Sequence, residues 1–162
     1  FGEYSGAGTI FGASGGVAEA AVRTAYEFAT GEQLNDVDFK PLRGTENRSR
    51  DVELDLKGTK LVVRVVSTLK EAEKSIQEIK AGNAPFQMLE VMACPGGCIN
   101  GGGQPRSCDD SKIKGERAEG LYKEDIELPL RKSHMNPYIQ KLYQEYLEHP
   151  NSHKAHEILH ND

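Results

Sequence analysis

The stretch LVVRVVSTLKEAEKSIQEIKAGNAPFQMLEVM, residues 61–92, decides the fold class. It begins with an apolar, β-branched run at 61–66, which is typical of a buried strand. Thr68 is predicted to cap a helix, in which apolar residues recur on one face until the stop at Gly82. Residues 86–92 are a short apolar run that predicts another strand. This alternation of strand and helix favours an α/β lobe.

The sequence before this stretch supplies further strands. Residues 52–56 alternate apolar and acidic side chains, and a Lys-Gly-Thr turn at 57–59 joins them to 61–66, which predicts a hairpin. Residues 37–42 also alternate like a strand. Pro41 has no N–H to give to a neighbouring strand, so this strand is expected at a sheet edge.

The opening segment, residues 1–16, is rich in glycine and predicts a loop that can turn sharply or approach another group closely. It does not fit a dinucleotide-binding fingerprint, because Phe11 stands where that pattern requires glycine. A helix is predicted to follow, with Ser14 as its N-cap and Gly31 as its stop.

The chain changes character after the lobe. Residues 106–133 are charged and interrupted by two glycines and a proline, which indicates a surface-wrapping segment. Residues 137–147 predict a helix that Pro150 ends. We therefore expect an α/β fold: one mixed-sheet lobe flanked by helices over 1–105, followed by a mostly helical, surface-wrapping C-terminal tail over 106–162.

Composition excludes several function classes. The 162 residues carry a net charge of -5, which provides no positive electrostatic potential for non-specific binding of nucleic acid or an anionic membrane. No apolar run approaches the roughly 18 residues of a membrane span. No signal peptide is visible, and the chain opens at Phe1 without an initiator Met. We therefore expect a piece of a longer protein, without a membrane or nucleic-acid partner.

The cysteines indicate chemistry rather than crosslinking. Cys94, Cys98 and Cys108 fall within fifteen positions, and an odd, clustered set is unlike a disulfide framework. It points to a reduced compartment and to metal binding or catalysis. The alternative is that one or two of them are small buried hydrophobes.

The strongest motif is MACPGGCINGGGQP, residues 92–105. Two thiolates four positions apart on a Gly-rich loop can point at one soft metal centre, and the glycines let backbone N–H groups approach the sulfurs. The spacing alone does not name the metal. Zinc would need two more ligands, and a cubane iron–sulfur cluster takes four cysteines.

These residues resemble a known family. The run from Glu90 through Cys94 and Cys98 to Pro105 is similar to the third signature motif of the iron-only (di-iron) hydrogenases. FGEYSG at 1–6 and FGASGGV at 11–17 resemble the segment that precedes this motif in that family.

The tail resembles the same family. RKSH at 131–134 and AHEILH at 155–160 are similar to the small-subunit region that is fused to the catalytic chain in many members. The resemblance therefore covers nearly the whole chain and implies residues 1–105 as large-subunit lobe and 106–162 as small-subunit-like tail.

The resemblance implies roles for the residues of the cysteine motif. Cys94 and Cys98 would be two of the four thiolate ligands of a 4Fe-4S cubane, and the sulfur of Cys98 would bridge to the di-iron unit where hydrogen binds. Met92 would place its thioether beside the carbonyl ligands of that unit. Cys98 and Met92 are thus the expected catalytic residues.

The resemblance also implies a cofactor pocket. Phe11, Gly12 and Val17 would line the pocket of the di-iron unit, with backbone N–H groups and apolar contacts to its cyanide and carbonyl ligands. Cys108 lies outside the motif and is interpreted as an incidental thiol.

The family's first and second signature motifs, which would supply the other two cubane cysteines, a cyanide-contacting Lys and a proton-relay Cys, are absent from this sequence. The resemblance implies that they lie upstream in the parent. The chain alone is expected to be without its cluster and not to turn over hydrogen. Expected partners are the upstream hydrogenase lobe, iron–sulfur domains, and a ferredoxin-like or NAD(P)H-linked electron partner, in the cytoplasm of an anaerobe.

The expected function is reversible reduction of protons to molecular hydrogen by the intact parent. The alternative is a hydrogenase-like iron–sulfur protein that serves in electron transfer, sensing or cluster assembly. A remote alternative is a zinc metalloprotease, because His156, Glu157 and His160 match His-Glu-x-x-His. A catalytic zinc needs a third protein ligand, however, and only Asn161 and Asp162 follow.

Overall fold

A computed structural model describes residues 2–106 and 110–160 of the chain. Phe1 and Cys108, both named in the sequence interpretation, lie outside the described residues, as do Asn161 and Asp162.

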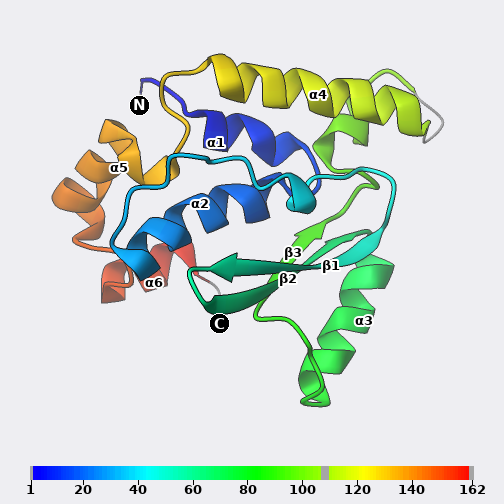
Figure 1. Ribbon diagram of the computed structural model, residues 1–162, viewed down its shortest axis with the longest axis horizontal. Coiled ribbons are helices and arrows are strands. Elements are labelled where there is room, and N and C mark those ends of the chain that lie inside the picture. Colours follow the sequence, from blue (N-terminus) through cyan, green and yellow to red (C-terminus); the bar gives the residue numbers. More distant parts are fainter. Residues whose placement is uncertain (1, 107–109, 161–162) are drawn as a thin grey trace.

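The lobe is built on a three-stranded sheet of order β1-β2-β3 (Figure 1). β1 (Ser49–Leu56) and β2 (Thr59–Ser67) form an antiparallel hairpin, and β3 (Met88–Met92) pairs with β2 in parallel. The predicted hairpin, the predicted strand within 86–92 and the mixed sheet are therefore confirmed.

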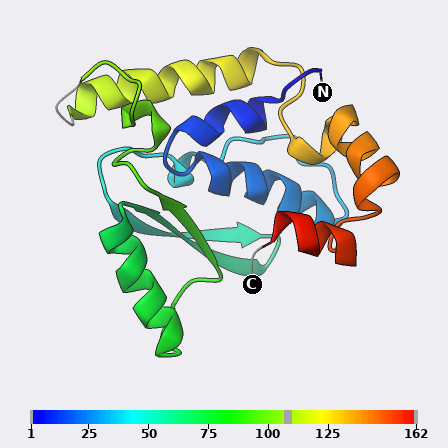
Figure 2. The ribbon, with the colours of Figure 1, turned by 180° about the vertical axis from the view of Figure 1, so that it is seen from behind.

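The helix predicted between the two parallel strands is also confirmed. α3 (Leu69–Lys80) crosses from β2 to β3, and it lies on the opposite side of the molecule from α5 (Figure 2). Thr68 occupies the N-cap position, but its side chain makes no capping hydrogen bond. Gly82 follows the helix with a φ of 71°, the left-handed conformation common after a helix end.

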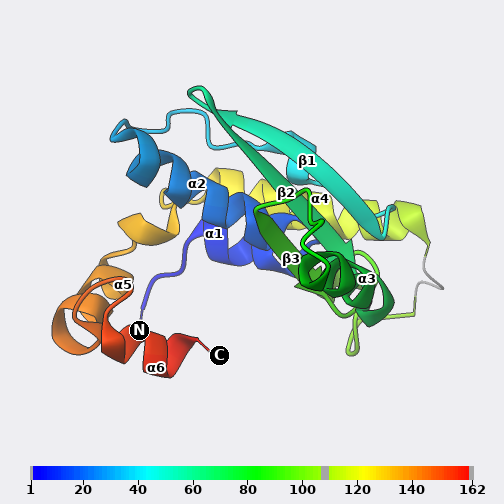
Figure 3. The same cartoon turned by 90° about the horizontal axis from the view of Figure 1, so that it is seen from below.

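The two faces of the sheet have different cover (Figure 3). α2 (Gly16–Thr30) packs on one face and forms the main core with alternate strand residues. On the opposite face, Arg64 pairs with Asp51 of β1 and with Glu78 of α3. The buried members of the core are Ala18, Val22, Leu42, Val52, Leu54, Leu56, Val63 and Val65.

Residues 37–42 do not form the edge strand that their alternation predicts. They run without strand pairing into a 3-10 turn at Lys40–Leu42, in which Pro41 stands at the start. Leu42 is fully buried against α2 and the sheet. The apolar residues of this segment therefore reflect a loop packed over the core.

The glycine-rich opening is more ordered than the predicted loop. It contains the short helix α1 (Gly6–Thr9), capped by the Ser5 side chain, and a 3-10 turn at Ile10–Gly12.

The tail after residue 106 is mostly helical, as predicted, but Gly115 and Gly120 do not interrupt its first helix as expected. α4 (Ser111–Glu127) is a helix of 17 residues that stacks beside α1, on the side away from the sheet (Figure 1). Asp110 caps it by accepting hydrogen bonds from the backbone N–H groups of Lys112 and Ile113. Gly115 and Gly120 have open space where a side chain would stand, so they face outward and do not break the helix.

The end of the chain is helical, as predicted. α5 (Pro137–Leu142) continues into a π-helical turn at Tyr143–Leu147, and the helix ends before Pro150. α6 (His153–Leu159) follows, with the Ser152 side chain as its N-cap.

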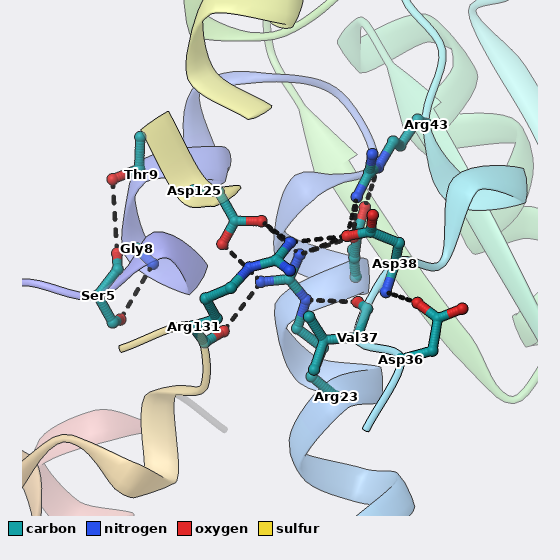
Figure 4. Close-up of polar contacts among 11 residues, drawn as sticks. Ser5, Gly8, Thr9, Arg23, Asp36, Val37, Asp38, Arg43, Asp125 and Arg131 are labelled. Atoms are coloured by element: carbon teal, nitrogen blue, oxygen red, sulfur yellow. Dashed lines mark hydrogen bonds and ion pairs between the residues drawn. The ribbon is translucent and has the colours of Figure 1, made fainter. Parts of the chain in front are cut away.

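A buried ion cluster joins the helices of the lobe to the tail (Figure 4). The Arg23 side chain is fully buried on α2 and donates to both carboxylate oxygens of Asp125 on α4, at 2.8 Å each. It also donates to Glu19, one turn earlier, at 2.8 Å. Arg43, Asp38 and Arg131 complete the cluster. The cluster thus sets three arginines against three carboxylates.

Asp125, at the centre of the ion cluster, is paired with arginines and closely packed against α1. Burial alone would raise the pKa of Asp125, but hydrogen bonds from Arg23 and Arg131 hold that pKa below its usual value. A Cβ added at Gly6 would lie 2.0 Å from an Asp125 oxygen, so α1 approaches α4 only because this residue is glycine. One side of α4 therefore packs against the lobe, with Asp125 in the interior.

Removal of the Asp125 carboxylate tests this linkage. Asp125→Ala leaves the Arg23 guanidinium buried without its main partner, so we expect a loss of about 3–5 kcal/mol in the free energy of unfolding, measured by urea denaturation. The control is Glu127→Ala, two residues away on α4, which removes only an exposed pair with Lys123 and should cost less than about 1 kcal/mol. Equal losses in the two variants would show that the buried cluster does not join α4 to α2.

A second link between α2 and the tail depends on pH. Glu27 accepts hydrogen bonds from Lys132, the Leu34 backbone and His134, and the Lys132 hydrogen bond is the main cause that lowers the Glu27 pKa to about 2. Because the pKa is lower in the folded chain than the roughly 4.3 of a free glutamate, this group stabilises the fold above that pH. The stabilisation is lost as the pH falls toward 2. We expect Glu27→Gln to flatten the acid side of the stability–pH curve; curves that run parallel below pH 5 would contradict this.

Candidate functional site

The motif of two cysteines forms a tight turn directly after β3. The Gly97 N–H donates to the Cys94 carbonyl at 3.0 Å, which closes the turn. Gly96 and Gly97 have φ values of 82° and 98°, which side-chain-bearing residues rarely adopt. A short 3-10 turn, Cys98–Asn100, follows and carries the second thiol.

Both thiols of the turn are free. Cys94 is partly buried and Cys98 is exposed, and they form no disulfide. A Cβ added at Gly101 would lie 3.4 Å from the Cys94 sulfur, so the glycine brings bare backbone close to that thiol. The turn therefore presents two soft ligands beside exposed backbone, which is the chemistry that an iron–sulfur cluster requires.

The turn packs against the loop that the sequence interpretation treats as a cofactor pocket. The Ser14 N–H donates to the Gly96 carbonyl at 3.0 Å. A Cβ added at Gly97 would lie 2.7 Å from the Gly12 carbonyl oxygen and 2.8 Å from the Ser14 nitrogen. The absence of a side chain at Gly97 thus allows direct backbone contact between two motifs that are about 80 residues apart in the sequence.

The other predicted site residues lie on elements that this contact joins. Phe11 and Gly12 belong to the 3-10 turn after α1, and Phe11 is 45% exposed. Val17 lies in the first turn of α2 and Met92 ends β3; both are partly buried. The structure therefore gathers the elements that carry these four residues and the two cysteines around one loop–turn junction.

Glu90 is a site residue to which the sequence analysis gave no role. It is 5% exposed on β3, and its Oε1 and Oε2 accept hydrogen bonds from the Gly15 N–H at 2.6 Å and the Ala18 N–H at 2.7 Å. Desolvation raises the Glu90 pKa, although these hydrogen bonds act against the rise. Its inward position, in phase with Met88 and Met92 on an apolar strand, was the available signal.

The prediction that Ser14 is the N-cap of α2 is wrong, because Glu90 bonds to the start of this helix. Gly15 occupies that position with a φ of 93°, and the Glu90 carboxylate takes the place of a local cap. The Ser14 hydroxyl is buried and finds no hydrogen-bond partner among the described residues. A carboxylate that is distant in the sequence thus takes the capping role that was predicted for the local Ser14 side chain.

Arg50 of β1 holds the same loop from the other side. Its Nη2 donates to the Ser14 carbonyl at 3.0 Å and to the Leu42 carbonyl at 2.6 Å. Desolvation lowers the pKa of this guanidinium, and the nearby Glu90 carboxylate acts in the opposite direction. The buried Glu90 carboxylate and the half-buried Arg50 guanidinium therefore flank the loop that contacts the cysteine turn.

The histidine pair of the protease alternative lies apart from this junction, on and just after α6. His156 and His160 are exposed, and their Nδ1 atoms lie 2.7 Å apart. Within residues 2–106 and 110–160, no group of three or more His, Cys, Asp or Glu side chains could hold a metal ion. The described part of the chain thus offers no third ligand for a catalytic zinc.

The number of available metal ligands also bears on whether the turn could hold an iron–sulfur cluster. The two thiols of the turn could provide half of the four ligands of a cubane, and the described residues offer no third. The donor chemistry of the turn fits the cluster, and the number of donors fits a shared site.

No helix in the described part of the chain has the length and apolar character of a membrane span.

Comparison with protein families divides the chain into two matches. Residues 1–102 match the family model for the iron only hydrogenase large subunit, C-terminal domain. Residues 111–162 match the family model for the iron hydrogenase small subunit.

Individual relatives agree with these matches. The chain is 46% identical over 159 residues to NADP-reducing hydrogenase subunit HndD of Solidesulfovibrio fructosivorans, which covers 98% of the chain and 27% of that protein. It is 33% identical over 152 residues to cytosolic iron-sulfur assembly component 3 of Rattus norvegicus, which covers 92% of the chain and 31% of that protein. The chain thus spans under a third of the length of these curated relatives.

A solved structure shows the same fold. An FeFe-hydrogenase variant from Chlamydomonas reinhardtii superposes with a TM-score of 0.66 at 38% sequence identity. The match covers 93% of the chain and 44% of that structure.

A side chain at Gly97 should disrupt the loop–turn junction. Gly97→Ala places a Cβ against backbone atoms of Gly12 and Ser14 and requires a conformation that costs alanine roughly 1–3 kcal/mol. We expect urea denaturation to show a loss of about 2 kcal/mol or more in the free energy of unfolding. The control is Gly102→Ala, whose Cβ meets nothing within 4 Å and should change stability by less than about 0.5 kcal/mol. Similar stabilities for both variants would refute the close contact.

Proposed function

The chain belongs to the iron-only hydrogenase family, and we propose that it is the C-terminal part of a catalytic subunit that reversibly converts protons and electrons to molecular hydrogen. The observation that carries this proposal is the free-thiol turn at Cys94 and Cys98, packed directly on the Phe11–Val17 loop. The match of residues 1–102 to the large-subunit family model supports it.

In this proposal, the thiolates of Cys94 and Cys98 would provide two of the four ligands of a 4Fe-4S cubane, and Cys98 would also link the cubane to a di-iron unit. When bound, this cofactor supplies electron transfer and an iron that binds hydrogen. The polypeptide upstream in the parent supplies the remaining thiolates, because the described residues offer only two.

The chain's own residues shape the surroundings of the cofactor in this proposal. The apolar side chains of Phe11, Val17 and Met92 exclude water from the di-iron unit, and Gly12 leaves its backbone accessible to the ligands. A dry surround of this kind limits solvent access and sets the electronic properties of a metal site. In this proposal, residues upstream in the parent transfer protons to and from the metal site.

The partners proposed for the chain follow from its incomplete ligand set. They are the upstream hydrogenase lobe with its iron–sulfur domains and a ferredoxin-like or NAD(P)H-linked electron partner, in the cytoplasm. A relative named as an NADP-reducing hydrogenase subunit favours the NAD(P)H-linked alternative. We also propose a division near residue 106, which the two separate family matches support.

A second candidate function is iron–sulfur cluster assembly or electron transfer without hydrogen turnover. The similarity to cytosolic iron-sulfur assembly component 3 over most of the chain favours it. The two candidates differ in the parent. A proton-relay Cys upstream, together with hydrogen evolution by the loaded protein, supports catalysis; cluster cysteines alone and no hydrogen evolution support the second candidate.

Substitution of Cys98 in the intact parent tests the ligand assignment. We expect Cys98→Ser to lower hydrogen evolution by more than about 100-fold, because even the outer partners of metal ligands cost roughly 10- to 100-fold when they are lost. Iron content measured in parallel should fall as well. Hydrogen evolution near the wild-type rate with full cluster loading would refute the assignment.

The matched control for this experiment is Cys108→Ser, since Cys108 lies outside the motif and is interpreted as an incidental thiol. It should leave hydrogen evolution and iron content unchanged. The 162-residue chain alone provides a further check, because two ligands cannot retain a cubane. Finding about four irons per isolated chain would contradict the shared-site proposal.

A further inference from the structure

Glu90 connects the strand that leads to the cysteines with the helix that follows the pocket loop. Its backbone is paired in the β2–β3 ladder opposite Val65, while its carboxylate accepts the Gly15 and Ala18 N–H groups of α2 at 2.6 and 2.7 Å. A backbone hydrogen bond from Val17 also acts to lower the Glu90 pKa. The start of α2 therefore cannot slide along β3 or rotate against it without losing a hydrogen bond.

The same loop is held at a second point, beyond the first cysteine. The Ser14 N–H donates to the Gly96 carbonyl at 3.0 Å. Cys94 lies between Glu90 and Gly96 in the sequence, so the loop is attached to the chain on both sides of this thiol. The position of the Cys94 thiol relative to the loop thus depends on both attachments.

Arg50 fixes the opposite side of the loop. Its Nη2 bonds to the Ser14 and Leu42 carbonyls at 3.0 and 2.6 Å. A Cβ added at Gly15 would lie 2.7 Å from the same nitrogen, so the guanidinium sits directly against the loop backbone. Its positive charge also favours the ionised Glu90 carboxylate.

These contacts exceed what capping of α2 requires. Ser14 stands next to the N-cap position, and its hydroxyl is left without a partner among the described residues. A local hydroxyl cap would satisfy first-turn N–H groups without burial of a carboxylate, which is costly in a desolvated site. The carboxylate of Glu90 contributes what a local cap cannot, namely a fixed spacing between α2 and β3.

Resting on the proposed function, we propose that Glu90, with Arg50 behind it, is a positioning residue that sets the spacing between the Phe11–Val17 loop and the thiol-bearing turn Cys94–Cys98. It does not touch the cluster. It determines where the two thiolates stand relative to the pocket, and thereby the geometry of the half-site that the cluster meets.

Two substitutions separate the reach of this side chain from its acceptor oxygens. Glu90→Gln keeps the length but turns an NH2 donor toward a backbone N–H. Glu90→Asp keeps both acceptor oxygens but withdraws them by one carbon–carbon bond, about 1.5 Å. The control is Ser152→Ala, which removes a buried N-cap of α6 that bonds to the Ala155 N–H and lies outside the loop and the turn.

The first measurement uses the intact parent without iron. Alkylation rates of Cys94 and Cys98 with iodoacetamide are read by peptide mass spectrometry, since thiol reactivity follows exposure and local environment. Both Glu90 variants should change the ratio of the two rates by about tenfold, while Ser152→Ala leaves the ratio at its wild-type value. A wild-type ratio in both Glu90 variants would overturn the proposal.

The second measurement uses the parent loaded to full iron content. We expect both Glu90 variants to shift the electron paramagnetic resonance spectrum of the cluster and to lower hydrogen evolution by about 10- to 100-fold, the scale of a misplacement near 1 Å. Ser152→Ala should change neither. A wild-type spectrum in the Glu90 variants, or an equal shift in the control, would assign Glu90 a merely structural role.

The alkylation measurement and the Cys98→Ser experiment together separate this proposal from the proposed function. Retention of iron and activity by Cys98→Ser would refute the hydrogenase ligand assignment. The alkylation ratio involves no iron, so it would still decide whether Glu90 sets the spacing of the loop and the turn.

Discussion

The fully buried guanidinium of Arg23 constrains the whole helical layer of the protein. A charge in the interior is unfavourable by several kcal/mol unless carboxylates pair with it in good geometry. Those carboxylates come from Glu19, one turn away on α2, and from Asp125, which is 102 residues later on α4. The small-subunit-like tail therefore supplies a charge that the large-subunit lobe needs for its own interior, although separate family models describe the two parts.

The elements that the sequence predicted are those with an apolar face. The hairpin, α2, α3 and β3 were predictable because their apolar side chains repeat with the period of the element. α4 was not, since Lys114 and Asp125, both buried on it, are charged and give no apolar periodicity. The strand prediction for 37–42 was wrong for the opposite reason. Its apolar residue Leu42 is buried in the core from a 3-10 turn, so an apolar pattern arose without a strand.

The sequence alone shows the thiols of the candidate site but not how the site is assembled. The spacing of Cys94 and Cys98 among glycines indicated a metal site without any structure. The contact between their turn and the opening loop depends on the missing side chain of Gly97, which no local pattern encodes. The role of Glu90 was equally hidden, because its hydrogen bonds reach 75 and 72 residues away.

The two buried charge clusters of the protein differ in how well they are satisfied. Around Arg23, three arginines face three carboxylates, and among the described residues the Nε of Arg131 is the one buried polar atom of this cluster that lacks a partner. Beside the loop that contacts the cysteine turn, the Ser14 hydroxyl and two guanidinium nitrogens of Arg50 are buried without partners among those residues. The Tyr122 hydroxyl is also without a partner there, but its ring lies under Arg43 of the first cluster. Buried polar groups without a protein partner are uncommon in folded proteins, and each one calls for a specific explanation such as strain, function or an ordered water. The imbalance therefore lies beside the loop–turn junction, where position matters more for the proposed function than stability does.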